Sequence, residues 1–198
     1  MEDRERIYPA ADADVFARER LSAKRYGHTL RVANTAEDLA RAHGLDPGRA
    51  RLAALLHDAA REMSSDEFLD LAEDLELPVG EPERESPKLL HGPVAAGLAR
   101  RELGVEDEGV LAAIGEHTTG RPGMAPLSLV LYVADKIEPA RDYPSVENLR
   151  RLARRNLRAA AAESLRRSIA HNEERGRPTG HSSGTPLVLS ASAKTWEA

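Results

Sequence analysis

The sequence predicts an all-α domain, and three observations support this fold class. Aromatic residues make up only 4% of the 198 residues, whereas Ala, Leu, Arg and Glu, which favour helices, are abundant. Apolar residues recur at spacings of three and four, which is the period of an amphipathic helix. Residues that typically start or end helices separate these segments. We therefore expect a bundle of helices.

In the first half of the chain we predict helices over residues 12–23, 26–43, 47–60 and 65–75. Gly44 supplies a helix stop after the second of these. Asp46, followed by a proline, has the character of an N-cap before a first-turn proline. Ser64 precedes acidic residues that favour the start of a helix. The third helix, which is strongly apolar, is expected to be central.

In the second half we predict helices over residues 94–103, 106–116, 127–137 and 145–174. Pro, Gly and Glu dominate residues 77–87, so we expect a loop there. The segment 118–123 contains two glycines and a proline and should interrupt the bundle. The last predicted helix is rich in Arg and Ala and carries a buried stripe of leucines.

Composition restricts the class of protein. No apolar run approaches the roughly 20 residues needed to cross a bilayer, and no apolar signal core follows the N-terminus, so we expect a cytoplasmic protein. The net charge of −5 argues against a nucleic-acid-binding surface, although a pocket on an acidic protein can still attract a small anion. With no cysteine, a transition-metal site must use histidines and carboxylates.

The chain length suits one buried domain with appendages. We expect this domain to span residues 1–176, with its core at 25–174. Residues 177–198 are rich in Gly, Pro, Ser and Thr and should form a flexible C-terminal extension. An apolar stretch at 186–189 could dock on the domain or on a partner.

The apolar run that ends in His57 and Asp58 is the centre of the predicted site. Polar residues at the edges of other apolar helices form a wider set with this pair: His28, His91, His117 and Asp135. About one helix separates successive members, so neighbouring helices of a bundle could each direct one ligand to a common point. Taken singly, His28 and His117 could equally be satisfied helix-terminal histidines, and the His57–Asp58 pair alone would more often be a core histidine beside its neighbouring aspartate. For Asp135 the alternative is a buried ion pair with an arginine, because we expect Lys136 to face another direction.

Five motifs carry a family resemblance: Arg25-Tyr26-Gly27-His28, Leu55-Leu56-His57-Asp58, Leu90-His91-Gly92-Pro93, His117-Thr118-Thr119-Gly120-Arg121 and Ala134-Asp135-Lys136-Ile137-Glu138-Pro139-Ala140-Arg141. Their order and context resemble the HD-domain metal-dependent phosphohydrolases, and specifically the YqeK-type branch. The likeness runs from about residue 25 to residue 174. It implies an all-α HD-domain helical bundle with a di-metal site in its core.

The resemblance also implies an activity, namely symmetrical hydrolysis of diadenosine tetraphosphate to two ADP at a pair of iron ions. Carried over by position, one metal would be held by His28, His57, Asp58 and Asp135, and the second by His91 and His117, with Asp58 as the bridge. Histidine and carboxylate ligands also suit manganese, cobalt or zinc. The oligomeric state is left open, with a homodimer as one option.

Catalytic roles are expected for His57, Asp58 and Arg61. Arg61 stands where the family pattern leads us to expect a lysine, and a guanidinium can still bind phosphate. The expected substrate contacts are Arg25, Arg61, Thr118, Thr119, Arg121, Lys136 and Arg141. Two alternatives remain: an HD-domain phosphohydrolase or phosphodiesterase acting on another (deoxy)nucleotide, and a nucleotide-binding module without catalysis.

Overall fold

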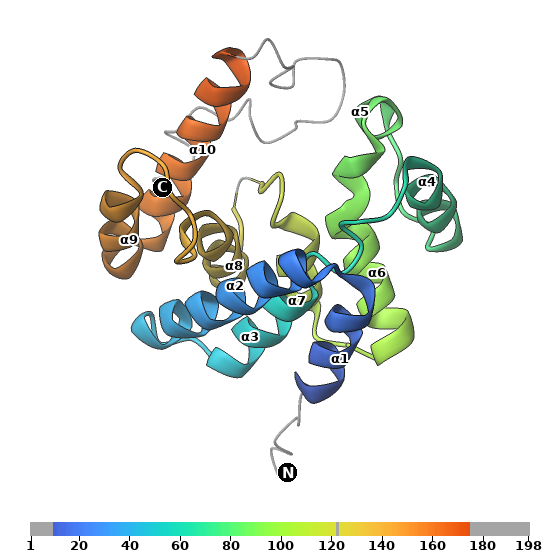
Figure 1. The fold of residues 1–198 in the computed structure, drawn as a ribbon, viewed down its shortest axis with the longest axis horizontal. Coiled ribbons are helices and arrows are strands. Elements are labelled where there is room, and N and C mark those ends of the chain that lie inside the picture. The colour runs from blue at the N-terminus through green and yellow to red at the C-terminus, as the bar shows by residue number, and fades with distance from the viewer. Residues whose placement is uncertain (1–9, 122, 175–198) are drawn as a thin grey trace.

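The computed structural model describes residues 10–121 and 123–174, and all regular structure in this part is helical. Figure 1 shows the helices arranged around a common centre. In chain order they are α1 (Ala10–Arg20), α2 (Ala23–Ala42), α3 (Pro47–Leu56), α4 (Ser65–Asp74), α5 (Glu81–Glu85), the 3-10 helix η1 (Pro87–Leu90), α6 (His91–Leu103), α7 (Glu108–Glu116), α8 (Pro126–Ile137), α9 (Val146–Arg155) and α10 (Leu157–Glu174). The expected all-α bundle is confirmed.

The core lies where α2, α3, α7 and α8 pack together (Figure 1). Every residue from Leu52 to Leu56 in α3 is buried, and so is every residue from Leu127 to Asp135 in α8. A helix that is apolar on all sides must be enclosed by others. These two helices therefore bring the polar residues at their C-terminal ends into the interior of the bundle.

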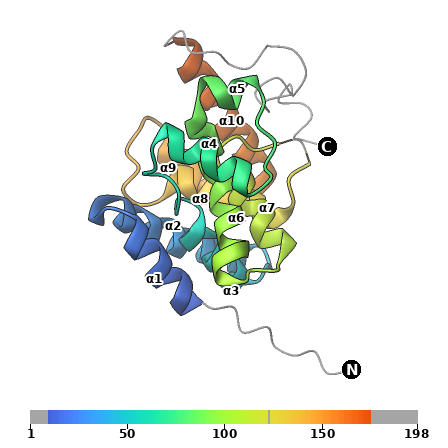
Figure 2. The ribbon, with the colours of Figure 1, turned by 90° about the vertical axis from the view of Figure 1, so that its right-hand side faces the viewer.

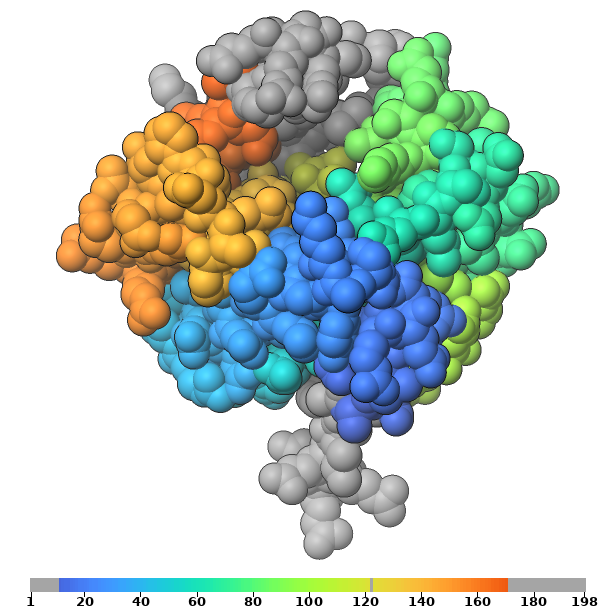
Figure 3. Space-filling view, viewed as in Figure 1, coloured from blue at the N-terminus to red at the C-terminus, as the bar shows by residue number. Residues whose placement is uncertain are grey.

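The remaining helices cover this core from three sides. Figure 2 shows α4, α5 and α6 together on one side, and α9 and α10 pack against α8 on another. In Figure 3, α1 and α2 cover the front of the molecule. Among the described helices, none combines the length and apolarity needed to span a membrane.

Two of the predicted helix starts are formed by side-chain caps. Asp46 accepts hydrogen bonds from the backbone N–H groups of Gly48 and Arg49, at 2.7 and 3.1 Å. Ser64 and Glu67 form a reciprocal capping box at the start of α4. Such caps satisfy N–H groups that have no partner within the helix, and they depend on local sequence alone. This explains why both starts could be predicted.

The three largest differences from prediction concern the third helix, the predicted loop and the last helix. The third helix ends at Leu56 rather than at residue 60, and tight turns follow it. The segment expected to be a loop holds α5, and η1 begins at its last residue; the first turns of both contain prolines, which need no N–H partner there. The last predicted helix is broken at Asn156, which is extended and whose side chain accepts from Ala159 N at 3.0 Å. Asn156 thus ends α9 and caps α10.

The proposed C-terminal extension, residues 177–198, lies outside the described residues. So does the apolar stretch at 186–189 within it.

Candidate metal centre

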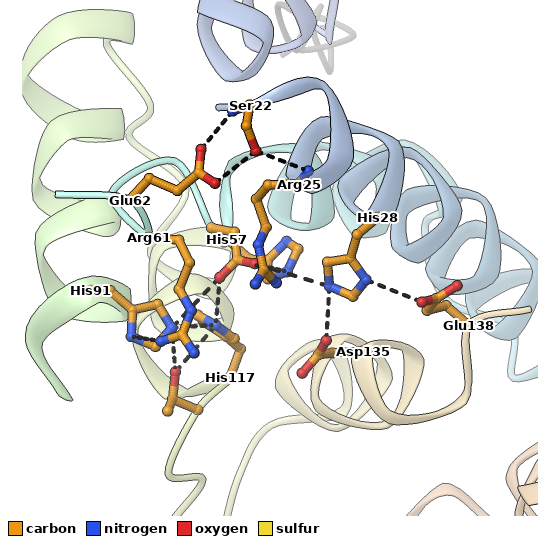
Figure 4. Close-up of polar contacts among 12 residues, drawn as sticks. Ser22, Arg25, His28, His57, Arg61, Glu62, His91, His117, Asp135 and Glu138 are labelled. Atoms are coloured by element: carbon orange, nitrogen blue, oxygen red, sulfur yellow. Dashed lines mark hydrogen bonds and ion pairs between the residues drawn. The ribbon is translucent and has the colours of Figure 1, made fainter. Parts of the chain in front are cut away.

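Four buried histidines from four different helices converge on one point in the bundle (Figure 4). His28 lies within α2, His57 directly follows α3, His91 begins α6 and His117 directly follows α7. Three of the four therefore stand at helix ends, where the chain changes direction. The residues predicted from the sequence to share a site do lie together.

Three of these imidazoles are anchored in the same way, through ring Nδ1 to the backbone carbonyl three residues earlier. The distances are 2.5 Å for His57 to Ala54, 2.6 Å for His91 to Lys88 and 2.7 Å for His117 to Ile114. A carbonyl oxygen can only accept, so Nδ1 carries the hydrogen in each contact. Nε2 of each neutral ring is therefore left with a free lone pair.

In His28, too, ring Nδ1 faces an acceptor, but this acceptor belongs to a side chain rather than to the backbone. Its Nδ1 lies 3.2 Å from Oε1 of Glu138, which is 2% exposed. Burial opposes ionisation of Glu138, but hydrogen bonds from Arg31, the Ala140 backbone and His28 outweigh it and lower the carboxyl pKa. Because a carboxylate can only accept, the Glu138 contact places the hydrogen on His28 Nδ1, while Nε2 makes no hydrogen bond even though Asp135 Oδ1 lies 3.1 Å away. All four Nε2 lone pairs are thus available for a cation.

Asp58 lies between two pairs of these nitrogens. Its Oδ2 is 3.5 Å from His57 Nε2 and 4.0 Å from His28 Nε2. Its Oδ1 is 3.6 Å from His91 Nε2 and 3.7 Å from His117 Nε2. Two three-residue groups therefore share Asp58, and in each group the ligand atoms lie within 4.8 Å of one another.

This donor set is suited to divalent cations. His28 Nε2 and His57 Nε2 are buried without a hydrogen-bond partner. His91 Nε2 and His117 Nε2 lie 3.1 Å apart, and the Thr118 hydroxyl, 2.9 and 3.2 Å from them, has one hydrogen to give. Buried acceptors without donors are costly. Metal ions would use these lone pairs, and neutral imidazole is a common metal ligand.

Near neutral pH, protonated histidines do not take the place of metal ions as the source of positive charge in the centre. Burial, reinforced by the neighbouring His117, lowers the pKa of His57 from 6.5 to about 4 despite the attraction of Asp58. Burial, His117 and the Arg61 guanidinium together lower the pKa of His91 to about 3. Both rings are therefore neutral at pH 7, which is the form that binds metal.

Close packing of α6 on α7 brings His91 to His117. At Gly92, an added Cβ would lie 3.0 Å from the carbonyl oxygens of Ile114 and Gly115, and 3.3 Å from His117 Nδ1. Such contacts are tighter than ordinary Cβ packing, so α6 and α7 would have to shift by a few tenths of an ångström. Glycine at position 92 therefore allows the second group of ligands to form.

Asp135 approaches the centre from α8. Its Oδ1 lies 3.1 Å from His28 Nε2 and 2.7 Å from the Arg141 guanidinium, and its Oδ2 lies 2.7 Å from Lys136 Nζ. The expectation that Lys136 faces another direction was wrong, because its long side chain folds back over Tyr132 to the carboxylate. Burial opposes ionisation, but the Lys136 ammonium, His28 and the Arg141 guanidinium together outweigh it and hold the pKa of Asp135 well below its usual range. Metal ligation by Asp135 stays a prediction.

The HD-domain family model matches residues 25–140, which is more than half of the chain. This protein belongs to the HD-domain family.

Relatives of this HD-domain chain share most of its length. It is 39% identical over 167 residues to a Bacillus subtilis (strain 168) protein named symmetrical bis(5'-nucleosyl)-tetraphosphatase, covering 84% of this chain and 89% of that protein. A Staphylococcus aureus (strain NCTC 8325 / PS 47) protein of the same name is 39% identical over 138 residues, covering 70% and 71%. A crystal structure of a predicted HD superfamily hydrolase involved in NAD metabolism, from Clostridium acetobutylicum, matches with a TM-score of 0.86 at 30% identity, covering 94% and 96%. The predicted HD-domain fold is confirmed.

Cationic and hydroxyl side chains surround the metal centre of this HD domain. Arg25 donates to Asp58 Oδ2 at 3.1 Å, and Arg61 NH1 lies 3.2 Å from His91 Nδ1 (Figure 4). Both guanidinium groups lie beside the centre. Lys136 and Arg141 reach it through Asp135. Of the seven predicted substrate contacts, Arg25, Arg61, Thr118, Lys136 and Arg141 are thus at or beside the centre.

The other two, Arg121 and Thr119, form no hydrogen bond or ion pair with the centre among the described residues. Arg121 pairs with Glu116, and its side chain is 55% exposed. The Thr119 side chain makes no hydrogen bond in the described part of the chain. Substrate binding by Arg121 and Thr119 stays a prediction.

Two residues beside the HD-domain centre were not found from the sequence. Glu138 lies one turn after Asp135, and a carboxylate there was a signal, but its burial depends on packing against α2. Glu62 accepts from the Ser22 backbone N–H and hydroxyl at 2.5 and 2.7 Å. It thereby ties the start of α2 to the segment after Asp58 and places Arg25 over the centre. No local pattern indicates that contact.

Proposed function

We propose that this protein is a metal-dependent phosphohydrolase that cleaves diadenosine tetraphosphate symmetrically into two ADP. The observation that carries the proposal is the convergence of four unprotonated Nε2 atoms on the Asp58 carboxylate. The names of the Bacillus subtilis and Staphylococcus aureus relatives support this substrate. A cytoplasmic location and a homodimeric state remain predictions.

We assign the first metal to His28, His57, Asp58 and Asp135, and the second to His91 and His117, with Asp58 as the bridge. The two oxygens of Asp58 face different histidine pairs, which supports a shared carboxylate. Bound divalent ions would supply a water of lowered pKa and neutralise phosphoryl charge. Iron is the metal we expect, and the ligand types also suit manganese, cobalt or zinc.

Arginines beside the centre would bind and orient the phosphates. Arg25 and Arg61 both contact members of the centre and are partly exposed to solvent, so they can meet an incoming substrate. A guanidinium offers several N–H donors in one plane and can bind two phosphate oxygens at once. The Thr118 hydroxyl, between His91 and His117, adds a donor for a phosphate oxygen.

A cavity of about 590 Å³ is lined in part by Lys136 and Arg141, the two cations that contact Asp135. Its lining among the described residues includes Lys136, Arg141, Tyr143, Ser164 and Arg167. Cavities of roughly 300–1,000 Å³ accommodate small organic ligands. We propose that it takes one nucleoside end of the dinucleotide. Its three cations would meet phosphates, and its Tyr143 ring and hydroxyls offer contacts to base and ribose.

The cleavage position depends on how many phosphates of the substrate the site binds on one side of the scissile bond. A site that holds one half as a nucleoside diphosphate places the attacking water opposite the middle bridge, which yields two ADP. A site that held only a terminal nucleoside monophosphate would yield AMP and ATP. Cations beside the centre support binding of the nucleoside diphosphate half. Arg25 and Arg61 contact Asp58 and His91, and Lys136 and Arg141 contact Asp135.

Product analysis tests the proposal. The purified protein, supplied with Fe²⁺, Mn²⁺ or Co²⁺, should convert diadenosine tetraphosphate to ADP as the dominant product, measured by chromatography. AMP and ATP in equal amounts would refute symmetrical cleavage. No consumption with any of these metals would favour another (deoxy)nucleotide substrate or a binding module without catalysis.

A further inference from the structure

Glu138 is a buried carboxylate whose two oxygens are fully engaged beside the metal centre. Oε1 lies 3.2 Å from His28 Nδ1. Oε2 accepts from Arg31 Nε at 2.7 Å and from Ala140 N at 2.8 Å. Figure 4 shows the His28 ring between Glu138 on one side and Asp135 on the other. We propose that Glu138 is a positioning residue that holds His28 with Nε2 toward the metal.

The need for such a residue comes from where His28 lies in its helix. The other three histidines of the centre stand at helix ends, where a backbone carbonyl is within reach of Nδ1. His28 lies inside α2, where backbone carbonyls are occupied by helical hydrogen bonds. Its imidazole must therefore take a partner from another part of the chain. Glu138, just after the end of α8, is that partner.

A carboxylate gives this histidine more than a carbonyl would. Accepting the Nδ1 hydrogen keeps the lone pair on Nε2, and negative charge behind the ring makes Nε2 a stronger ligand. Losing such a partner typically weakens metal binding about 10- to 100-fold. The inference rests on the proposed function in one respect, namely that His28 is a metal ligand.

The position of Glu138 is itself held by a second group. Arg150 of α9 donates to the backbone carbonyls of Ile137, Glu138 and Arg141, at 2.9, 2.9 and 3.0 Å. These contacts hold the turn after α8 in one conformation. The Glu138 side chain therefore starts from a fixed backbone position beside His28.

The test is the affinity of metal-free protein for Mn²⁺, measured by calorimetry on the full chain. Glu138→Gln keeps the shape of the side chain but removes its charge, and we expect about 10- to 100-fold weaker binding of the first Mn²⁺. The matched control is Glu37→Gln. Glu37 lies in the same helix as His28 and pairs with Arg41 and Arg51 near the surface, so its loss should leave Mn²⁺ affinity unchanged.

Two further measurements separate positioning from folding. Long-range ¹H–¹⁵N spectra should show the His28 Nδ1–H tautomer in the metal-free protein and a mixture of tautomers in Glu138→Gln.

If Glu138→Gln does not fold, Arg31→Met serves instead. The Arg31 side chain is 39% exposed and holds Glu138 Oε2, so this variant should fold and bind Mn²⁺ several-fold more weakly.

Unchanged Mn²⁺ affinity in a folded variant would overturn the role of Glu138 while leaving the proposed metal site intact. A wild-type protein that binds neither Mn²⁺ nor Fe²⁺ would overturn both.

Discussion

His91 Nε2 and His117 Nε2 lie 3.1 Å apart, although each ring carries its hydrogen on the opposite nitrogen. Two lone pairs at that distance repel each other unless a hydrogen or a cation comes between them. Thr118 can supply a hydrogen to only one of the two. The metal-free protein should therefore be less stable than the loaded one, which leads to the first prediction.

We predict two divalent ions per chain after mild purification, measured by elemental analysis. Chelation should lower the melting temperature by several degrees, because a ligand that binds only the folded state stabilises it. Scanning calorimetry before and after metal is restored measures the difference. A reproducible stoichiometry near zero, with no activity regained in iron, manganese or cobalt, would rule out the di-metal centre.

Asp58→Ala should remove both metals, because the two oxygens of this carboxylate face different histidine pairs. His117→Ala should weaken mainly the second metal, since its Nε2 faces Asp58 Oδ1 together with His91. Metal content of the two purified variants provides the comparison. Equal losses would argue against a bridging Asp58.

Stability of the metal-free protein should fall as the pH is lowered from about 6.5 toward 4. The unfolded state binds protons at His57 and His91 below about pH 6.5, whereas the folded state does so only near pH 4 and pH 3. Lower pH therefore favours unfolding in this window, by about 1.4 kcal/mol per pH unit for each histidine. Urea unfolding at pH 7, 6 and 5 measures the slope. His91→Gln should reduce it by about half, and a flat profile would contradict the lowered pKa values.

Gly92→Ala should separate α6 from α7, because the new Cβ would lie 3.0 Å from two backbone carbonyl oxygens. We expect a loss of about 1–3 kcal/mol in stability, typical of overpacking, and weaker binding of the second metal than of the first. Gly115→Ala is the control, since nothing lies within 4 Å of its added Cβ. Comparable effects of the two substitutions would mean that contact at Gly92 does not align His91 with His117.

Arg25→Ala should lower kcat/KM for diadenosine tetraphosphate about 10- to 100-fold, the value of a lost charge-assisted hydrogen bond of roughly 1.5–3 kcal/mol. Metal content should not change, because a guanidinium has only donors, so the substitution removes no metal ligand. Arg121→Ala provides the comparison, and we expect it to lower kcat/KM less than Arg25→Ala, since Arg121 pairs with Glu116. An equal drop for Arg121→Ala would show that Arg121 leaves Glu116 when substrate binds.

Local signals explain what could be predicted of the fold. The starts of α3 and α4 depend on Asp46 and Ser64, whose capping partners lie two or three residues away. The break between α9 and α10 was missed because Asn156 can sit exposed within a helix or cap a new one. Packing of α9 and α10 against α8 selects the second conformation.

The histidines of the centre could be found from the sequence because each stands at the edge of an apolar helix. The directions in which long side chains point could not be found from the sequence. Lys136 turns back to Asp135, Arg121 pairs with Glu116, and Glu138 reaches across to α2. Each of these contacts is decided by which atoms the fold brings near, and residue spacing carries no information about them.

Three of the four imidazoles are oriented by backbone carbonyls, and backbone atoms are the same whatever side chain a residue carries. Substitution at Ala54, Lys88 or Ile114 would leave that orientation in place as long as the helix ends persist. Substitutions that preserve the packing of the buried Ala54 and Ile114 would thus leave the imidazoles oriented. His28 is different, because its orientation is encoded in a side chain that a single base change can replace. For protein engineers who wish to alter metal preference, the pair of His28 and Glu138 is the adjustable one among imidazoles otherwise oriented by the backbone.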